Sequence, residues 1–230
     1  MLLFSHLSHI YQQTYALKDL NLHLPQHTLT AIIGPNGAGK STFLKIIAGL
    51  LKPTQGHFSC QSKLNLAYLP QQSSLDKTFP LTVKDVVAMG LWPQIGMIQS
   101  VTSSQNRALE QAIQTVGLKG LEHHNLHTLS GGQFQRLLFA RMMVQDADIL
   151  LLDEPFAAVD EPTTTDLLGL LKQWHHQGKT ILAVMHNVNL VRQYFPHTLI
   201  LAKEVVAYGP TASVLTRDSL LRAHLREGLG

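Results

Sequence analysis

The sequence predicts an α/β fold with a mostly parallel sheet, an antiparallel β region at the N-terminus and an inserted α-helical subdomain. Two observations carry this prediction. Short apolar runs alternate with segments whose apolar residues recur at helical spacing. In addition, the strand-like runs 149–152 and 180–185 flank a helical segment at 166–174, which is the βαβ pattern of parallel strands. We therefore expect one domain over residues 1–230, with the helical subdomain at about 82–145 inside it.

The first part of the chain is expected to form strands, then a loop and a helix. The apolar runs 2–7, 20–24 and 29–33 are typical of strands, and the third leads into a glycine-rich turn. From residue 40 to residue 50 the apolar positions recur at helical spacing, and Pro53 follows as a breaker. A strand, a loop and a helix should therefore follow one another here.

The predicted subdomain is helical and rich in polar residues. Thr82 is expected to begin a helix, because Asp85 is placed as in a capping box. Pro93 and Gly96 are expected to interrupt that helix. A second helix is predicted at about 104–116.

The C-terminal tail is predicted to be a small β and helical region. Two apolar runs, at 199–202 and 205–208, indicate short strands. A short helix is expected around 220–225.

Composition argues against several classes of protein. Cys60 is the only cysteine, so neither an internal disulfide nor a cysteine metal cage is possible, which fits a reducing compartment. No run approaches the roughly 18 apolar residues of a spanning helix, and the first residues lack the basic region of a secretion signal. The net charge is +3 without a Lys/Arg block, so nucleic-acid binding is not expected. The histidines at 123–127 and 175–176 are expected to be solvated surface rather than a metal cluster.

A glycine-rich loop carries the strongest chemical signal. It fits the pattern G-x-x-x-x-G-K-[ST] between an apolar strand and a helical segment. Glycines let the backbone wrap around phosphates with its N–H groups pointing inward, and the helix N-terminus favours an anion. The loop and the residue after it are the candidate ATP-binding residues Gly34, Pro35, Asn36, Gly37, Ala38, Gly39, Lys40, Ser41 and Thr42.

Two members of this loop have specific expected roles. Lys40 should reach the β- and γ-phosphates of ATP, and the Ser41 hydroxyl should coordinate Mg²⁺. The alternative, a tight turn with an incidental lysine, leaves the matched positions and their flanks unexplained. The sequence therefore predicts a P-loop NTPase core with ATP and Mg²⁺ as its cofactors.

An apolar strand that ends in two carboxylates supplies the second part of the predicted site. Asp153 is expected to hold Mg²⁺, directly or through water, and Glu154 to orient or deprotonate the attacking water. The alternative is a pair of surface carboxylates at a strand end. A phosphate loop in the same chain makes the catalytic interpretation the better one.

A third motif precedes the helical run 134–144. The Ser130 hydroxyl and the amides of Gly131 and Gly132 at a helix N-terminus form a second potential anion site. The segment 129–160, LSGGQFQRLLFARMMVQDADILLLDEPFAAVD, resembles the signature-to-D-loop block of ATP-binding cassette (ABC) ATPases. The resemblance covers nearly the whole chain, and the motifs occur in the family's order. It implies that Ser130, Gly131, Gly132 and Gln133 serve a nucleotide held by the opposite subunit, with Asp160 at the dimer contact.

The same resemblance assigns three further residues. Tyr11 resembles the aromatic residue that stacks on adenine, with Tyr15 as the competing candidate and a core aromatic as the alternative. Gln71, after Pro70, resembles the Q-loop glutamine that contacts Mg²⁺ and the attacking water, although Gln72 is adjacent. His186 resembles the switch histidine that contacts the γ-phosphate, and it is followed by an asparagine where the family has aspartate.

The resemblance also implies partners and a location. One phosphate loop and one signature in a chain imply that two chains complete two sites, as a homodimer or with a second ATPase subunit, when ATP binds. Integral membrane permease subunits are the expected partners, with an extracytoplasmic substrate-binding protein acting indirectly. The chain is expected to be cytoplasmic and held at the inner face of the membrane by the permease.

The cargo is indicated by weaker sequence features. The stretch 68–90, and Phe156 in DEPF, are similar to ATPases of zinc, manganese and iron uptake systems, although Lys77 and Thr78 stand where those proteins have Trp-Asp. Import of a divalent metal ion is the expected function. The alternatives are another importer, for haem or siderophores, an exporter, and a non-transport ABC ATPase. A kinase or GTPase would leave the motif 129–133 unexplained.

Overall fold

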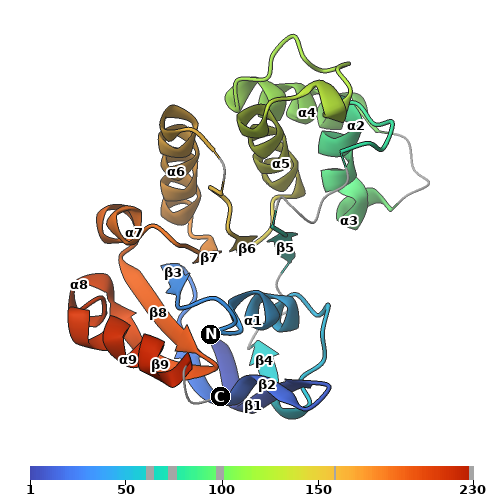
Figure 1. Cartoon of the computed structure of the whole chain (residues 1–230). Helices are drawn as coiled ribbons and strands as arrows, with labels where there is room; N and C mark the ends of the chain where they lie inside the picture. The colour runs from blue at the N-terminus through green and yellow to red at the C-terminus, as the bar shows by residue number, and fades with distance from the viewer. Residues whose placement is uncertain (61–64, 72–76, 97–100, 158, 228–230) are drawn as a thin grey trace. The chain divides into compact units, whose positions relative to one another are not determined.

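The computed structural model describes residues 1–60, 65–71, 77–96, 101–157 and 159–227, which form two compact units (Figure 1). The first unit contains Met1–Tyr68, Asp148–Glu154 and Lys172–Gly230. The second contains Leu69–Ala147 and Pro155–Leu171. The expected subdomain at 82–145 falls within the residues of the second unit.

The first unit begins with a three-stranded antiparallel sheet in the order β2-β1-β4. Its strands are β1 (Leu2–Tyr11), β2 (Thr14–Leu24) and β4 (Gln55–Cys60). The predicted runs 2–7 and 20–24 cover only parts of β1 and β2, and β4 was not predicted. The reason is that these strands carry many polar residues on their exposed face, so only the most apolar stretches were visible in the sequence.

A six-stranded sheet forms the centre of the same unit, in the order β5-β6-β7-β3-β8-β9. β3 pairs in parallel with β7 and β8, β6 pairs in parallel with β7, and β9 is antiparallel to β8. The strands are β5 (Leu66–Leu69), β6 (Ile149–Asp153), β7 (Thr180–Val184), β3 (Leu29–Ile33), β8 (His197–Ala202) and β9 (Glu204–Pro210). The predicted α/β class, with a mostly parallel sheet, an antiparallel N-terminal region and a helical insertion, is confirmed.

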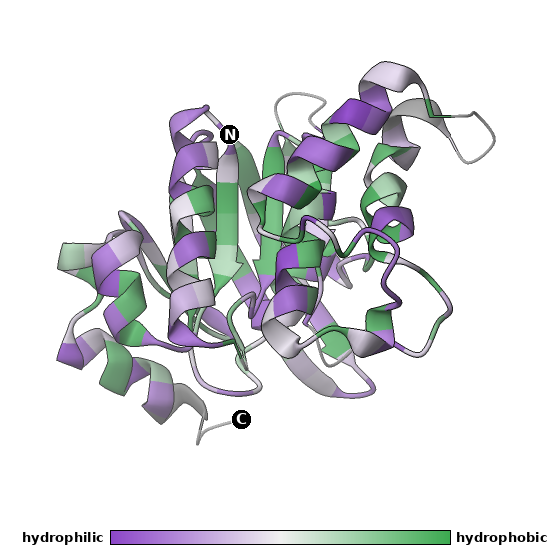
Figure 2. Ribbon diagram, turned by 90° about the horizontal axis from the view of Figure 1, so that it is seen from above, coloured by the Kyte–Doolittle hydropathy of each residue, from purple (hydrophilic) through white to green (hydrophobic). Residues whose placement is uncertain are grey.

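The central strands are apolar because both of their faces are covered. Every residue of β3, β6 and β7 is buried, and Figure 2 shows the strands as predominantly hydrophobic. Since parallel strands all run in the same direction, the segments that follow β3, β6 and β7 emerge at one edge of the sheet. The sheet thereby brings together three motifs that are far apart in the sequence.

The helices of the first unit differ from the prediction in extent. α1 (Lys40–Ile47) begins where expected and ends three residues early, and α9 (Arg217–Glu227) is longer than the predicted 220–225. α8 (Thr211–Val214) and α9 pack on β8 and β9 (Figure 1). α8 and α7 (Val188–Tyr194) were not predicted, because such short helices present too few turns for a periodic signal.

The second unit is helical, with α5 (Gly131–Gln145) at its centre and α2 (Val83–Ala88) and α4 (Ser103–Thr115) packed against it. Thr82 caps α2 through the predicted capping box with Asp85. The helix that begins after Thr82 ends at Ala88, and the 3-10 turn η2 and a new helix, α3, follow, with Pro93 in the first turn of α3, where no backbone N–H is needed. Gly96, with φ of 69°, does end α3. The elements are α2 (Val83–Ala88), η2 (Met89–Leu91), α3 (Trp92–Ile95), α4 (Ser103–Thr115), η3 (Leu126–Thr128), α5 (Gly131–Gln145) and α6 (Glu161–His176), whose last residues belong to the first unit.

Candidate functional site

The glycine-rich loop connects β3 to α1 and packs closely against the backbone of two other segments. A Cβ atom at Gly34 would lie 1.9 Å from the carbonyl oxygen of Leu201, and one at Gly39 would lie 2.2 Å from that of Ala16. Gly39 also has a φ of 88°, in the left-handed region that other residues rarely adopt. Glycine at these two positions is therefore required by close backbone contacts.

Lys40 is the first residue of α1 and is buried. Its ammonium donates hydrogen bonds to the carbonyl oxygens of Gly34, at 2.9 Å, and Pro35, at 2.7 Å. The side chain thus lies along the inside of the loop. Its expected contact with the β- and γ-phosphates remains a prediction.

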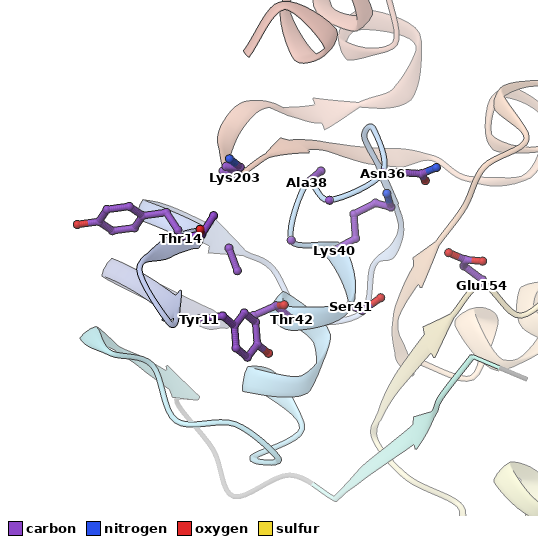
Figure 3. A pocket seen from close by; sticks show the side chains of 13 residues that line it. Tyr11, Thr14, Asn36, Ala38, Lys40, Ser41, Thr42, Glu154 and Lys203 are labelled. Atoms are coloured by element: carbon purple, nitrogen blue, oxygen red, sulfur yellow. The ribbon is translucent and has the colours of Figure 1, made fainter. Parts of the chain in front are cut away.

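A pocket of about 560 Å³ opens beside the loop (Figure 3). This volume is within the range of small-molecule sites. The pocket is lined by Tyr11, Thr14, Tyr15, Ala16, Asn36, Gly37, Ala38, Gly39, Lys40, Ser41, Thr42, Glu154 and Lys203. The lining therefore includes most of the predicted ATP-binding residues, but not Gly34 and Pro35 at the start of the loop.

Both candidate adenine-stacking residues line this pocket. Tyr11 is 47% exposed and Tyr15 is 38% exposed, so neither is a core aromatic. The His9 ring meets the Tyr11 ring edge-on, with 4.6 Å between the ring centroids, and so supports its orientation. Both tyrosines therefore remain candidates for stacking on adenine.

Asp153, the last residue of β6, is only 3% exposed. Its Oδ1 accepts a hydrogen bond from the Ser41 hydroxyl at 3.1 Å, and its Oδ2 accepts one from the Tyr68 hydroxyl at 3.3 Å. Burial raises the pKa of the Asp153 carboxyl, an effect that the hydrogen bond from Ser41 opposes. The Ser41 hydroxyl and the Asp153 carboxylate are adjacent hard oxygen donors, which is the ligand chemistry that Mg²⁺ prefers.

Glu154 and His186 come together although they are 32 positions apart in the sequence. Glu154 has a φ of 51°, which turns the chain sharply after β6. Its Oε1 lies 2.7 Å from Nε2 of His186, the second residue after β7. The glutamate side chain is 18% exposed and the histidine side chain 48%. A non-glycine residue in the left-handed region costs of order 1 kcal/mol.

Asn187, where the family has aspartate, is the N-cap of α7. Its side-chain oxygen accepts hydrogen bonds from the amides of Asn189 and Leu190, at 3.0 and 3.2 Å. Asparagine and aspartate are about equally good N-caps. The departure from the family's pattern therefore preserves the local structure that follows His186.

In the second unit the signature residues begin α5. Ser130 is its N-cap, and Ser130 and Gln133 form a reciprocal capping box with bonds of 3.2 and 3.0 Å. A Cβ atom at Gly132 would lie 3.0 Å from Oδ2 of Asp160, so the helix start and the D-loop residue are in close contact. A hydrogen bond from the Thr163 amide lowers the pKa of Asp160. Ser130, Gly131, Gly132, Gln133 and Asp160 thus form one surface region, and their role toward a second chain stays a prediction.

Gln71 also belongs to the second unit. Its expected contact with Mg²⁺ and water stays a prediction. The competing residue Gln72 lies outside the described residues, as does the rest of the stretch 72–76.

The histidine-rich stretches provide no metal cluster in the part of the chain that the structure describes. His123, His124 and His127 are exposed, and among the described residues no three or more His, Cys, Asp or Glu side chains are grouped so that they could hold a metal ion. Among the same residues, no helix is both long and apolar enough to cross a bilayer.

Thr14, Ala16 and Lys203 line the pocket and were missed in the sequence, as was Tyr68, which does not line the pocket but bonds to Asp153. Tyr68 begins the stretch 68–90, and its bond to Asp153 arises because β5 and β6 are neighbouring strands. Lys203 lies in the turn after β8, and nothing in its local sequence indicates a role. These residues are identified only in the structure, where strands that are far apart in the sequence are neighbours.

Removing the Tyr68 hydroxyl tests its effect on Asp153. In Tyr68→Phe the buried carboxylate loses one of its two hydrogen-bond donors described above, a change worth about 1–3 kcal/mol. We expect the Mg²⁺ concentration for half-maximal ATP hydrolysis to rise several-fold, as measured by a Mg²⁺ titration of phosphate release. Tyr194→Phe, at the end of α7, is the control. An unchanged Mg²⁺ requirement in Tyr68→Phe would show that this hydroxyl does not position Asp153.

The family model and the relatives that match this chain agree with one another. The family model described as "ABC transporter" matches residues 17–157. The zinc transport system ATP-binding protein TroB of Treponema pallidum is 40% identical over 93% of this chain and 83% of its own length. The manganese transport system ATP-binding protein MntB of Listeria monocytogenes is 37% identical over 93% of this chain and 92% of its own length.

Two solved structures extend this likeness to the whole fold. One is the dimeric ATP-binding cassette MJ0796 bound to ADP and phosphate, with a TM-score of 0.80 and 26% identity over 91% of this chain and 98% of that one. The other is an inward-facing ABC transporter assigned to the metal-chelate type, with a TM-score of 0.86 and 28% identity over 97% of this chain and 88% of that one.

Proposed function

The chain belongs to the ABC transporter family, as one of its ATPase subunits, and from this we propose that it hydrolyses ATP to power the import of a divalent metal ion such as zinc or manganese. One observation carries the catalytic part of the proposal. The phosphate loop, Asp153, Glu154 and His186 meet at the edge of one parallel sheet, where a pocket of suitable size opens.

The phosphate loop binds the nucleotide. The loop amides and the Lys40 ammonium attract the phosphates, while Tyr11 or Tyr15 stacks on adenine, an interaction worth roughly 1–3 kcal/mol by analogy with other base stacking. Ser41, Asp153 and Gln71 are the proposed residues around Mg²⁺, and the Ser41–Asp153 contact of 3.1 Å supports the first two. When bound, Mg²⁺ supplies positive charge that neutralises the phosphate oxygens.

Glu154 is the proposed general base. It orients the attacking water and accepts its proton as the water oxygen bonds to the γ-phosphorus and the bond to the β-phosphate oxygen breaks, which yields ADP and phosphate. Nε2 of His186 holds Oε1 of Glu154 at 2.7 Å, which restricts the orientation of the carboxylate. The resemblance to the family also assigns His186 a contact with the γ-phosphate, which we include in the proposal.

A second chain completes the proposed site. Each chain holds one phosphate loop and one signature region, so two chains would supply Ser130, Gly131, Gly132 and Gln133 to each other's nucleotide, with Asp160 at the contact. The helix start at Ser130 favours an anion. ATP bound between the chains would hold them together, and hydrolysis would release them.

The cargo and partners are proposed from the relatives and from the sequence. Proteins about 40% identical to this chain are named for manganese and zinc transport, and the stretch 68–90 with Phe156 supports the same class. The chain would act at the cytoplasmic face of a membrane, bound to permease subunits that receive metal from an extracytoplasmic binding protein. Nucleic acid is not among the proposed partners.

Uptake in cells tests the cargo. Deleting the gene should lower the accumulation of radioactive manganese or zinc, and the wild-type gene, but not one encoding Glu154→Gln, should restore it. The tagged protein should co-purify with a polytopic membrane protein. Normal metal uptake with a loss of haem or siderophore uptake would assign another cargo, and recovery only with ribosomes or DNA would favour a non-transport ATPase.

A further inference from the structure

The turn between β8 and β9 is attached to the phosphate loop. Lys203, with φ of 58°, occupies this turn. Its backbone N–H donates a hydrogen bond to the carbonyl oxygen of Ala38 at 2.9 Å, and its carbonyl oxygen accepts one from the Lys18 amide at 2.7 Å. Main-chain bonds therefore fix the position of Lys203 relative to the loop, whatever its side chain is.

The Lys203 side chain lines the same pocket as the loop. Figure 3 places it beside Ala38 and Thr14, on the opposite side of the pocket from Glu154. The neighbouring acid, Glu204, directs its carboxylate toward Lys18, with 3.7 Å between Oε1 and the Lys18 Nζ. Lys203 thus adds a positive charge to a pocket that already suits an anion.

We propose that the Lys203 ammonium binds the nucleotide at the phosphate segment that ATP and ADP share. The terminal phosphate is expected beside Lys40 and Glu154, and the base is expected at the tyrosines. Lys203 lies on the Ala38 side of the loop, away from Glu154. The phosphates that ATP and ADP share are therefore expected in the part of the pocket that Lys203 lines. A lysine ammonium is a strong donor to phosphate oxygens. This inference rests on the nucleotide site proposed above.

The affinities of Lys203→Met for ATP and ADP test whether Lys203 binds the phosphates that both nucleotides share. The dissociation constants of both nucleotides should rise by a similar factor, about tenfold, which is the effect of one charge-assisted hydrogen bond. Isothermal titration of the full chain measures them. Lys203→Arg should retain most of the affinity, because it keeps the charge. Lys18→Met is the matched control, since it removes a neighbouring positive charge that does not line the pocket, and it should leave both constants unchanged.

Three other outcomes would overturn the proposal. A loss of affinity for ATP alone would put Lys203 at the terminal phosphate, and unchanged affinities would remove it from the site. An equal loss in Lys18→Met would indicate a general charge effect. Thermal melting of each variant verifies the fold. If the wild-type chain itself binds no nucleotide, the site proposed above fails, and this result is distinct from a failure of Lys203.

Discussion

Lys40→Ala should abolish tight ATP binding and reduce ATP hydrolysis by at least about 100-fold. The ammonium is buried against the loop, where a charge-assisted interaction is much stronger than in water. Removing it eliminates a cation from the region expected to hold the β- and γ-phosphates, and a single lost contact to developing charge costs about 10²–10³ in rate. Titration with ATP and a phosphate-release assay measure the two effects.

The control for Lys40→Ala must separate binding from folding, because the ammonium also bonds the carbonyl oxygens of Gly34 and Pro35. Lys52→Ala removes the same charge from an exposed position after α1 and should leave binding intact. Thermal melting should show that Lys40→Ala remains folded. Undiminished ATP hydrolysis in a folded Lys40→Ala protein would contradict the assignment of the phosphate loop.

Glu154→Gln should bind ATP but hydrolyse it at least about 100-fold more slowly, since general-base catalysis contributes roughly 10²–10⁴. The substitution preserves the shape of the side chain. The amide oxygen can still accept the hydrogen bond that Nε2 of His186 makes with the carboxylate at 2.7 Å. Positioning is therefore retained while the proton acceptor is lost.

The same variant tests the proposed pairing of chains. With ATP bound and not hydrolysed, Glu154→Gln should accumulate as a dimer on size exclusion in the presence of ATP and Mg²⁺. Glu161→Gln, at the exposed start of α6, is a matched control and should behave as the wild type. A monomer under these conditions would count against ATP-driven pairing, and full activity would exclude Glu154 as the base.

The local features of the site were predictable because each is encoded in consecutive residues. The strand, loop and helix around Lys40 need an apolar run, glycines where the backbone is in close contact, and an amphipathic segment, and all are adjacent in the sequence. The predicted capping box at Thr82 acts over three residues, and so does the one at Ser130, which was not predicted. The buried run before Asp153 is apolar because both faces of the sheet are covered.

Other features were hidden because they depend on residues that are distant in the sequence. β4 has few apolar residues, and it is a strand because β1 pairs with it. The left-handed conformation of Glu154 is not indicated by its residue type. Its approach to His186 follows from the parallel pairing of β6 with β7, which aligns the ends of two strands.

By itself, the sequence determined that this chain has a phosphate-binding loop, an acidic strand end and a signature motif, because each depends on short-range backbone geometry. Only the tertiary structure decided which side chains line the pocket beside the phosphate loop and which ones contact Asp153. The bonds of Tyr68 to Asp153 and of Lys203 to Ala38 form between segments 85 and 165 residues apart, and it is the order of strands in the sheet that brings such segments together.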